Sequence, residues 1–163
     1  MRGILVYYYP GSAEGQRAAN LVADGLKQIY PLPNNVRAEP TIAIGEVRRV
    51  RAPSVFLELG YHDNVDDAAW IKNNLDSVAR SIALSLTEYF GLPFLTPQSP
   101  RSAVVDVSWG YLNIRDRPDR SAPVVARAYD GARLTVLNQW QGWYLVRFGE
   151  VMGWASSDFV TLI

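Results

Sequence analysis

A proline-rich segment between Gly91 and Ser102 divides this chain into two stretches with different patterning. The segment reads GLPFLTPQSPRS and holds three prolines; helical spacing precedes it and strand patterning follows it. Proline lacks the backbone N–H that helices and strand ladders use, so the segment predicts a stiff linker. We therefore expect a first domain over residues 1–94, a linker over 95–102 and a second domain over 103–163.

Composition excludes several kinds of site. The chain has no cysteine and one histidine, which excludes disulfides, thiol nucleophiles and any zinc site built from two histidines of this chain. Its 16 basic and 16 acidic side chains balance, so net charge predicts no nucleic-acid partner. No apolar run reaches the ~18 residues of a membrane span. The run Ile4–Tyr9 is also too short for a signal peptide.

The first stretch alternates between strand and helix patterns. A near-continuous apolar run at 4–9 predicts a strand covered on both faces, and its start so close to Met1 indicates a piece of a longer protein. The remaining predicted elements are a helix from the cap Ser12 to Ile29, strands at 41–44 and 54–59, and one long helix at 66–90, capped by Asp66 or Asp67 and ended by Gly91. This order predicts an α/β layer with a mostly parallel, narrow sheet whose edges need pairing or covering.

The second stretch loses the helical period. Short apolar segments separated by turn signals predict seven strands at 103–107, 111–114, 124–128, 134–139, 143–148, 153–155 and 159–162. Strands this short and this evenly spaced are typical of a small all-β barrel.

A carboxylate in the middle of an apolar strand is the most informative feature of the first stretch. Glu58 lies between Leu57 and Leu59, and burying an unpaired charge there is costly. Glu58 therefore either faces solvent from an edge strand or belongs to a ligand site at the carboxyl end of the strand. The polar run that follows, Gly60-Tyr61-His62-Asp63-Asn64, favours a site.

His62 has three possible roles: a metal ligand, an acid/base group or a loop histidine. Only Glu58 and Asp63 could join it as ligands, so we do not expect a complete zinc site and predict a hydrogen-bonded loop histidine. Asp63 and Asn64 also fit turn or cap positions. The basic cluster Arg48, Arg49 and Arg51 fits a solvated loop better than a contact for an acidic substrate.

The stretch VFLELGYHDN resembles a motif of zinc-dependent N-acetylmuramoyl-L-alanine amidases of the amidase-3 type, which are peptidoglycan hydrolases. The resemblance covers residues 1–94 and corresponds to the carboxyl-terminal half of such a domain. It implies that Glu58 matches the catalytic general acid/base. In the family, two His and one Glu upstream bind zinc, and this chain offers only His62 as a weak candidate metal ligand. The resemblance therefore implies zinc as the family cofactor, none bound by this chain, and no activity of the chain alone.

The second stretch resembles the bacterial Src homology 3 domain, which tethers wall hydrolases to peptidoglycan. The matching segments are YLNIR with Pro118, DG before LTV, GWYLVR and GW. Arg117 stands where glycine is more usual. We expect a ligand groove formed by Trp109, Tyr111, Asn113, Arg115, Trp140 and Tyr144, and we expect Trp143 and Trp154 to lie in the core.

These resemblances leave three functions open. The first is a peptidoglycan amidase or autolysin that acts at the cell wall or outside the cell, with Glu58 as acid/base and the second domain as anchor. The second is a non-catalytic peptidoglycan-binding protein. In the third, the half domain pairs through an exposed sheet edge with another copy or with a separate amino-terminal half.

Overall fold

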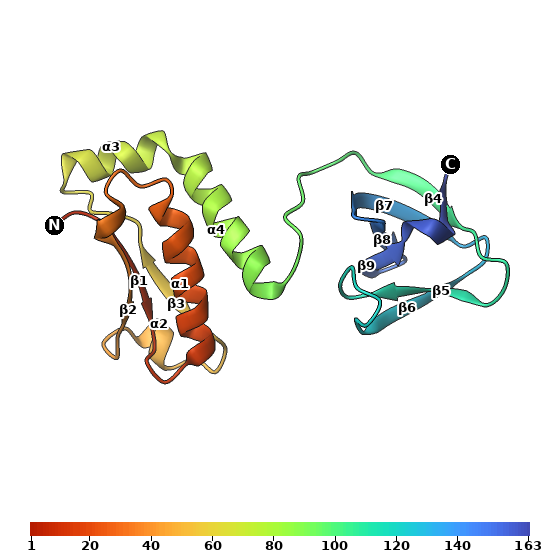
Figure 1. Cartoon of the computed structure of the whole chain (residues 1–163), viewed down its shortest axis with the longest axis horizontal. Coiled ribbons are helices and arrows are strands. Elements are labelled where there is room, and N and C mark those ends of the chain that lie inside the picture. Colours follow the sequence, from red (N-terminus) through yellow and green to blue (C-terminus); the bar gives the residue numbers. More distant parts are fainter. The chain divides into compact units, whose positions relative to one another are not determined.

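The structure, a computed structural model, describes residues 1–163 as two compact units (Figure 1). The units span Met1–Phe94 and Leu95–Ile163, and each surrounds its own hydrophobic core. The first unit is mixed α/β and the second is all-β, which confirms the predicted fold class. No helix combines the length and apolar character needed to cross a membrane.

A three-stranded sheet forms the centre of the first unit. Its strands β1 (Ile4–Tyr8), β2 (Val36–Pro40) and β3 (Val55–Glu58) lie in the order β2-β1-β3. The predicted mostly parallel sheet is wrong, because β1 is parallel to β2 but antiparallel to β3. The connection from β2 to β3 contains only the short helix α2 (Gly45–Arg48). A parallel arrangement would need a crossover along the full length of the sheet.

One predicted strand lies in the wrong place. Residues 41–44 form a bend in which the Thr41 hydroxyl accepts a hydrogen bond from the Ala43 N–H at 3.2 Å. The second strand of the sheet is instead formed by the polar segment β2. It occupies a sheet edge and buries only Val36. An edge strand with one buried side chain gives little apolar signal in the sequence.

The helices begin and end largely where their caps predict. Helix α1 (Ala13–Lys27) starts at Ser12, whose hydroxyl accepts from the Gly15 N–H at 3.0 Å. The predicted single helix over 66–90 is wrong, because α3 (Val65–Asn73) and α4 (Leu75–Phe90) are separated at Asn74. The side chain of Asn64, rather than Asp66 or Asp67, caps α3. Gly91 ends α4 in the left-handed conformation, as predicted.

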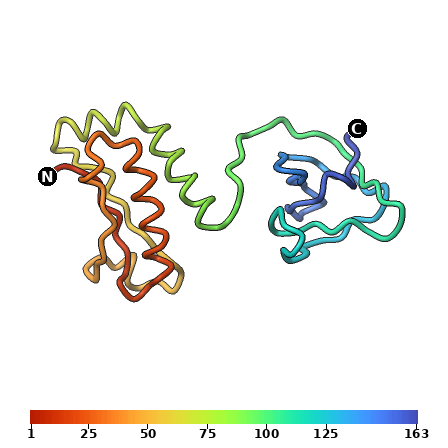
Figure 2. The backbone as a smooth tube through the Cα atoms, in the orientation of Figure 1, coloured from red at the N-terminus to blue at the C-terminus, as the bar shows by residue number.

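Helix α1 lies against one face of the sheet, and α4 packs beside α1 (Figure 2). The helix-facing side chains of β1 are Ile4, Val6 and Tyr8, all buried. The strand register places Tyr7, Glu39, Phe56 and Glu58 on the opposite face, where each is half-buried or exposed. Apart from the buried Leu5, polar and aromatic side chains therefore occupy the face of the sheet that α1 does not cover.

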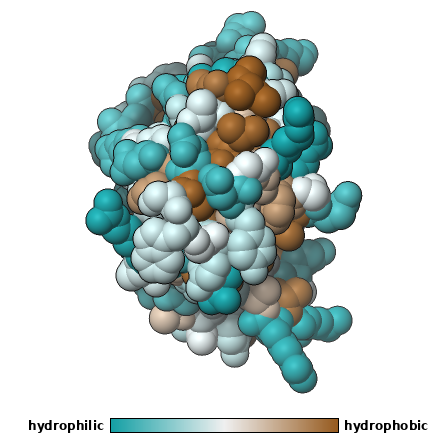
Figure 3. Space-filling model, turned by 90° about the vertical axis from the view of Figure 1, so that its right-hand side faces the viewer, coloured by the Kyte–Doolittle hydropathy of each residue, from teal (hydrophilic) through white to brown (hydrophobic).

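The second unit is a seven-stranded antiparallel sheet in the order β10-β4-β7-β8-β9-β5-β6. Its strands are β4 (Arg101–Val105), β5 (Tyr111–Arg115), β6 (Val124–Tyr129), β7 (Arg133–Trp140), β8 (Trp143–Phe148), β9 (Val151–Ser156) and β10 (Val160–Leu162). Strand β4 begins two residues before the predicted boundary at 103. The core includes Leu112, Ile114, Val136 and Val146. The space-filling view shows a surface on which apolar and hydrophilic side chains are mixed (Figure 3).

Candidate functional site

A groove of about 640 Å³ lies on the surface of the second unit. Aromatic side chains and two arginines line it, and no carboxylate does. The lining residues with side chains that define its chemistry are Trp109, Tyr111, Asn113, Arg115, Arg120, Trp143 and Phe159. Concave sites with apolar walls and a few polar groups are the usual form of ligand sites in proteins.

Strand β5 positions the centre of this groove through its two-residue alternation. Leu112 and Ile114 point into the core and are buried, whereas Tyr111, Asn113 and Arg115 line the groove. The Tyr111 ring packs edge-on against Tyr129 across the strand pair, at 6.2 Å between ring centroids. One strand therefore supplies both the floor of the groove and part of the core beneath it.

The loop before β5 carries the most exposed aromatic side chain of the groove. Trp109 is 87% exposed, while Tyr111 is 42% exposed. The loop is held at its start, because the Val107 N–H donates to the Asp130 carboxylate at 3.0 Å. An exposed indole at the rim of a groove offers a large surface for stacking on a ligand.

The loop after β5 carries Arg120. Arg115 fixes this loop by donating from Nη1 to the Ala122 carbonyl at 2.6 Å. Within the loop, the Asp119 carboxylate accepts from the Ser121 N–H at 2.7 Å and from its hydroxyl at 2.8 Å. These two bonds, the backbone one being the larger cause, hold the pKa of Asp119 below its ordinary value. Asp119 is thus ionised but engaged with Ser121.

Four of the six side chains predicted for the groove line it: Trp109, Tyr111, Asn113 and Arg115. Trp140 and Tyr144 lie outside it. Tyr144 packs against the core, and the Arg101 guanidinium carbon lies 5.7 Å from the centroid of the Tyr144 ring. Trp154 is buried as expected, but Trp143, also expected in the core, is half-buried and lines the groove.

The sequence reasoning missed Arg120 and Phe159 as groove residues. Arg120 belongs to a loop without a strand period, and Phe159 ends a short 3-10 helix (Ser157–Phe159). Neither residue lies in a strand, so no alternation of side chains along the sequence predicts which way its side chain points. For Trp143 a signal existed, since it begins a strand in which Leu145 and Arg147 follow on the same face.

Glu58 ends the edge strand β3, on the sheet face away from α1. Its carboxylate accepts a hydrogen bond from the Tyr61 hydroxyl at 3.4 Å. Burial, and then the charge of Glu58, raise the pKa of both Tyr61 and Tyr7. Glu58 therefore lies half-buried beside two protonated phenols.

The other polar residues around Glu58 do not form a metal site. His62 and Asp63 are exposed in the turn before α3, and Asn64 caps that helix. No group of three or more His, Cys, Asp or Glu side chains in the chain could hold a metal ion. Arg48, Arg49 and Arg51 are exposed, as a solvated loop predicts.

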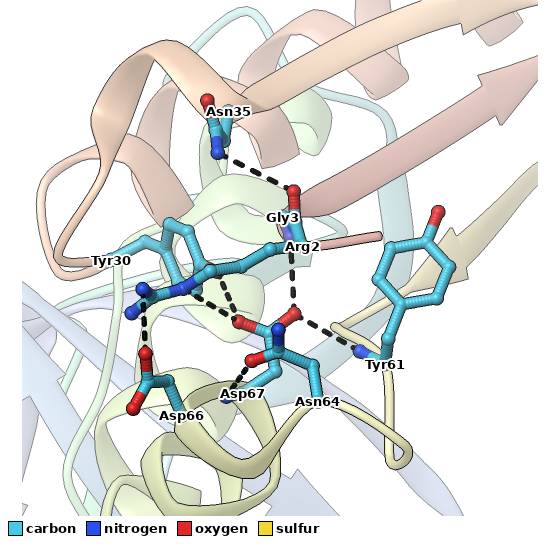
Figure 4. Close-up of polar contacts among 8 residues, drawn as sticks. All are labelled: Arg2, Gly3, Tyr30, Asn35, Tyr61, Asn64, Asp66 and Asp67. Atoms are coloured by element: carbon cyan, nitrogen blue, oxygen red, sulfur yellow. Dashed lines mark hydrogen bonds and ion pairs between the residues drawn. The ribbon is translucent and has the colours of Figure 1, made fainter.

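A buried carboxylate that the sequence reasoning treated only as a helix cap organises the same end of the first unit (Figure 4). Asp67 is fully buried and accepts hydrogen bonds from the N–H groups of Gly3 and Tyr61, both at 3.1 Å, and from the Tyr30 hydroxyl. Arg2 Nε lies 3.4 Å from its second oxygen. Asp67 thus joins β1, the end of α1 and the loop after β3.

The environment of Asp67 keeps it ionised. Burial by itself would raise the pKa of Asp67, but the hydrogen bonds from Tyr30, Gly3 and Tyr61 and the charge of Arg2 outweigh burial and lower that pKa. Gly60, at φ 140°, lets the chain pass close to this carboxylate, because a Cβ there would lie 3.2 Å from Asp67 Oδ2. The role of Asp67 is structural: it fixes the loop that holds Tyr61 beside Glu58.

Comparison with known proteins agrees with both resemblances. The family model of N-acetylmuramoyl-L-alanine amidase matches residues 1–88, and that of the bacterial SH3 domain matches residues 110–161. No curated protein matches the chain.

Among solved structures, the fold resembles the CwlD amidase from Clostridioides difficile, which was determined in complex with the GerS lipoprotein. The two chains are 18% identical with a TM-score of 0.52, over 56% of this chain and 47% of the CwlD chain. The chain therefore spans about half the length of that amidase. The match over residues 1–88 shows that this protein belongs to the N-acetylmuramoyl-L-alanine amidase family and that a bacterial SH3 domain follows its amidase region.

Proposed function

We propose that this protein binds peptidoglycan at the cell wall through the groove of its SH3 domain. The aromatic groove of about 640 Å³ is the observation that carries the proposal. Peptidoglycan presents sugar rings and peptide groups, which pack on indole and phenol faces through stacking and CH contacts. Trp109 and Tyr111 supply exposed aromatic surface of this kind, and Asn113 supplies a side-chain amide in the same lining.

An amidase role is a second candidate, supported by the position of Glu58. Zinc, in this family, activates the water that attacks the amide bond. The residues present do not fit a zinc site, because no cluster of three metal-binding side chains exists around Glu58 or elsewhere in the chain. The chain can supply Glu58 as the acid/base group and Tyr61 to orient its carboxylate. Amide hydrolysis then requires metal ligands from another segment or another polypeptide.

The unpaired edge of β3 gives such a segment a place to bind. Strand β3 lies at the edge of the three-stranded sheet, and Glu58 is its last residue. A strand added to this edge would lie beside the Glu58 carboxylate. A second copy of the chain or a separate amino-terminal half could supply the strand.

The binding proposal is tested by sedimenting the full chain with insoluble peptidoglycan. We expect the protein to pellet, and the Trp109→Ala variant to bind about tenfold more weakly, as for exposed aromatic anchors at interfaces. Met152→Ala is the matched control, since Met152 is a 62% exposed side chain of the same unit outside the groove. If the wild-type chain stays in the supernatant, or if both variants lose binding equally, the groove is not the binding site.

A further inference from the structure

The charge of the groove differs from that of the whole chain. The chain is neutral, with 16 basic and 16 acidic side chains, whereas the groove contains Arg115 and Arg120 and no carboxylate. Electrostatic attraction should therefore concentrate anionic ligands at this surface.

The two arginines have different tasks. Arg115 is half-buried, and its Nη1 donates a hydrogen bond to the Ala122 carbonyl at 2.6 Å, so Arg115 holds the loop in place. Arg120 is exposed at the groove within that loop. The charges beside Arg120 and Tyr111 already have partners: Arg117 pairs with Asp116 at 3.6 Å, Asp119 accepts two hydrogen bonds from Ser121, and the Arg127 guanidinium lies 4.7 Å from the centroid of the Tyr111 ring. The guanidinium of Arg120 is therefore the one available to a ligand.

Asn113 supplies a second unused polar group. Its Oδ1 is buried without a hydrogen-bond partner, although buried polar atoms are almost always paired. The terminal torsion of asparagine is broad and roughly two-fold, so rotation can present either the oxygen or the nitrogen to the groove. A side-chain amide that can both donate and accept matches one peptide group of a ligand.

Resting on the proposed binding function, we propose that the groove selects peptides with a free carboxylate. Arg120 binds the carboxylate, the Asn113 amide pairs with a peptide group, and Trp109 and Tyr111 cover the apolar part of the ligand. Arg115 acts as a positioning residue through the loop. Within peptidoglycan, the ligand is thus the stem peptide with its carboxylates unmodified, rather than the glycan strand, whose lactyl carboxyl groups are uncharged amides wherever a stem peptide is attached.

Two peptides that differ only in charge test this specificity. Acetyl-L-alanyl-D-glutamic acid and the same peptide amidated at both carboxyl groups are titrated into the full chain, with amide and indole N–H shifts followed by NMR. We expect the amidated peptide to bind about five- to tenfold more weakly, as for one partly exposed charge-assisted contact. We also expect the difference to shrink as salt rises.

Variants assign the effect to residues. Arg120→Gln should bind both peptides equally, and Asn113→Asp should lose the preference for the acid because its new carboxylate repels the ligand. Arg133→Gln, an exposed arginine outside the groove, is the matched control and should keep the preference. An unchanged NMR spectrum outside the groove shows that each variant is folded. Restoration of the preference by Arg120→Lys would confirm that the charge is what matters.

Other outcomes overturn the inference. Equal binding of both peptides to the wild-type chain contradicts it, and pelleting with peptidoglycan in the same preparation would show that the binding function stands without it. Absence of both peptide binding and pelleting removes the function and the inference together. Tighter binding of an oligonucleotide of equal charge would identify the groove as a general anion site and overturn the peptide specificity.

Discussion

At the scale of single residues, Asp67 shows how a buried charge can stabilise this fold. Its carboxylate accepts from donors on three segments, and replacing it by an amide would turn one of the two accepting oxygens into an NH2 donor that faces buried N–H or O–H groups. Asp66 contacts the same Arg2 at 2.8 Å, but its side chain is 67% exposed. The two adjacent carboxylates therefore make a matched pair, one buried and one in solvent.

We predict that Asp67→Asn lowers the unfolding free energy of the first unit by about 2 to 4 kcal/mol, the cost of leaving several buried donors unsatisfied. Asp66→Asn should leave the unfolding midpoint nearly unchanged, because exposed ion pairs contribute little. Urea unfolding followed by circular dichroism measures both. Equal midpoints for the two variants would contradict the structural role of Asp67.

The same group predicts a pH dependence. Its folded-state pKa lies below the ordinary value of 3.8, so its stabilisation is present above that value and is lost as pH falls through the folded-state pKa. The unfolding free energy of the wild-type chain should therefore decrease on acidification from about pH 5 downward. The decrease should be shallower in Asp67→Asn, which no longer titrates at this position.

At the scale of elements, the close packing of α1 on α4 depends on Gly25. A Cβ at this position would lie 2.8 Å from Ser81 Oγ and 2.9 Å from Ser85 Oγ. At Gly45 in α2, the nearest atoms belong to Arg49, at 3.9 and 4.0 Å. Both glycines lie in helices, so replacement by alanine should raise the helix propensity at each position. Only at Gly25 should the added methyl group clash with neighbouring atoms.

We predict that Gly25→Ala destabilises the first unit by about 1 kcal/mol, as overpacking outweighs the gain in helix propensity. Gly45→Ala should be neutral or stabilising. Thermal unfolding of the two variants gives the comparison. A stabilised Gly25→Ala variant would show that the serine hydroxyls rotate away and that the helix contact is loose.

The elements also show what sequence patterns can and cannot predict here. The helical spacing of α1 and the apolar run of β8 predict these two elements close to their observed bounds. Strand β2 was not, because pairing with β1 rather than apolar content makes it a strand. The break at Asn74 was also missed, since the apolar spacing runs on through it, while Asn74 Nδ2 donates to the Trp70 carbonyl at 2.8 Å and ends α3.

In the candidate sites too, the sequence predicts only those residues that a regular strand or helix pattern places. Tyr111, Asn113 and Arg115 could be placed together because β5 alternates, whereas Arg120 reaches the groove only through a folded loop. Asp67 looked like an ordinary acidic residue in the first turn of a helix. Its burial depends on Gly3 and Tyr30, which are distant in sequence, and no local pattern encodes that contact.

At the scale of the whole molecule, the chain combines an aromatic groove in one unit with Glu58, the proposed acid/base residue, in the other. We predict that the purified chain binds no stoichiometric zinc and releases no stem peptide from cell walls, because its side chains form no metal site. Metal analysis and assay of released peptide check this. Release of peptide by the wild-type chain but not by Glu58→Gln would instead show that the chain is a complete amidase.

The hydrogen bond from Gly3 to Asp67 spans 64 positions of the chain. During synthesis, β1 and α1 leave the ribosome before Asp67 does. Gly3 and Tyr30 therefore lack their hydrogen-bond acceptor until Asp67 has emerged. Contacts between residues so far apart form late and slow the folding of a domain. The nascent first unit therefore gains the stabilisation from the buried Asp67 carboxylate only after the start of α3 has emerged from the ribosome.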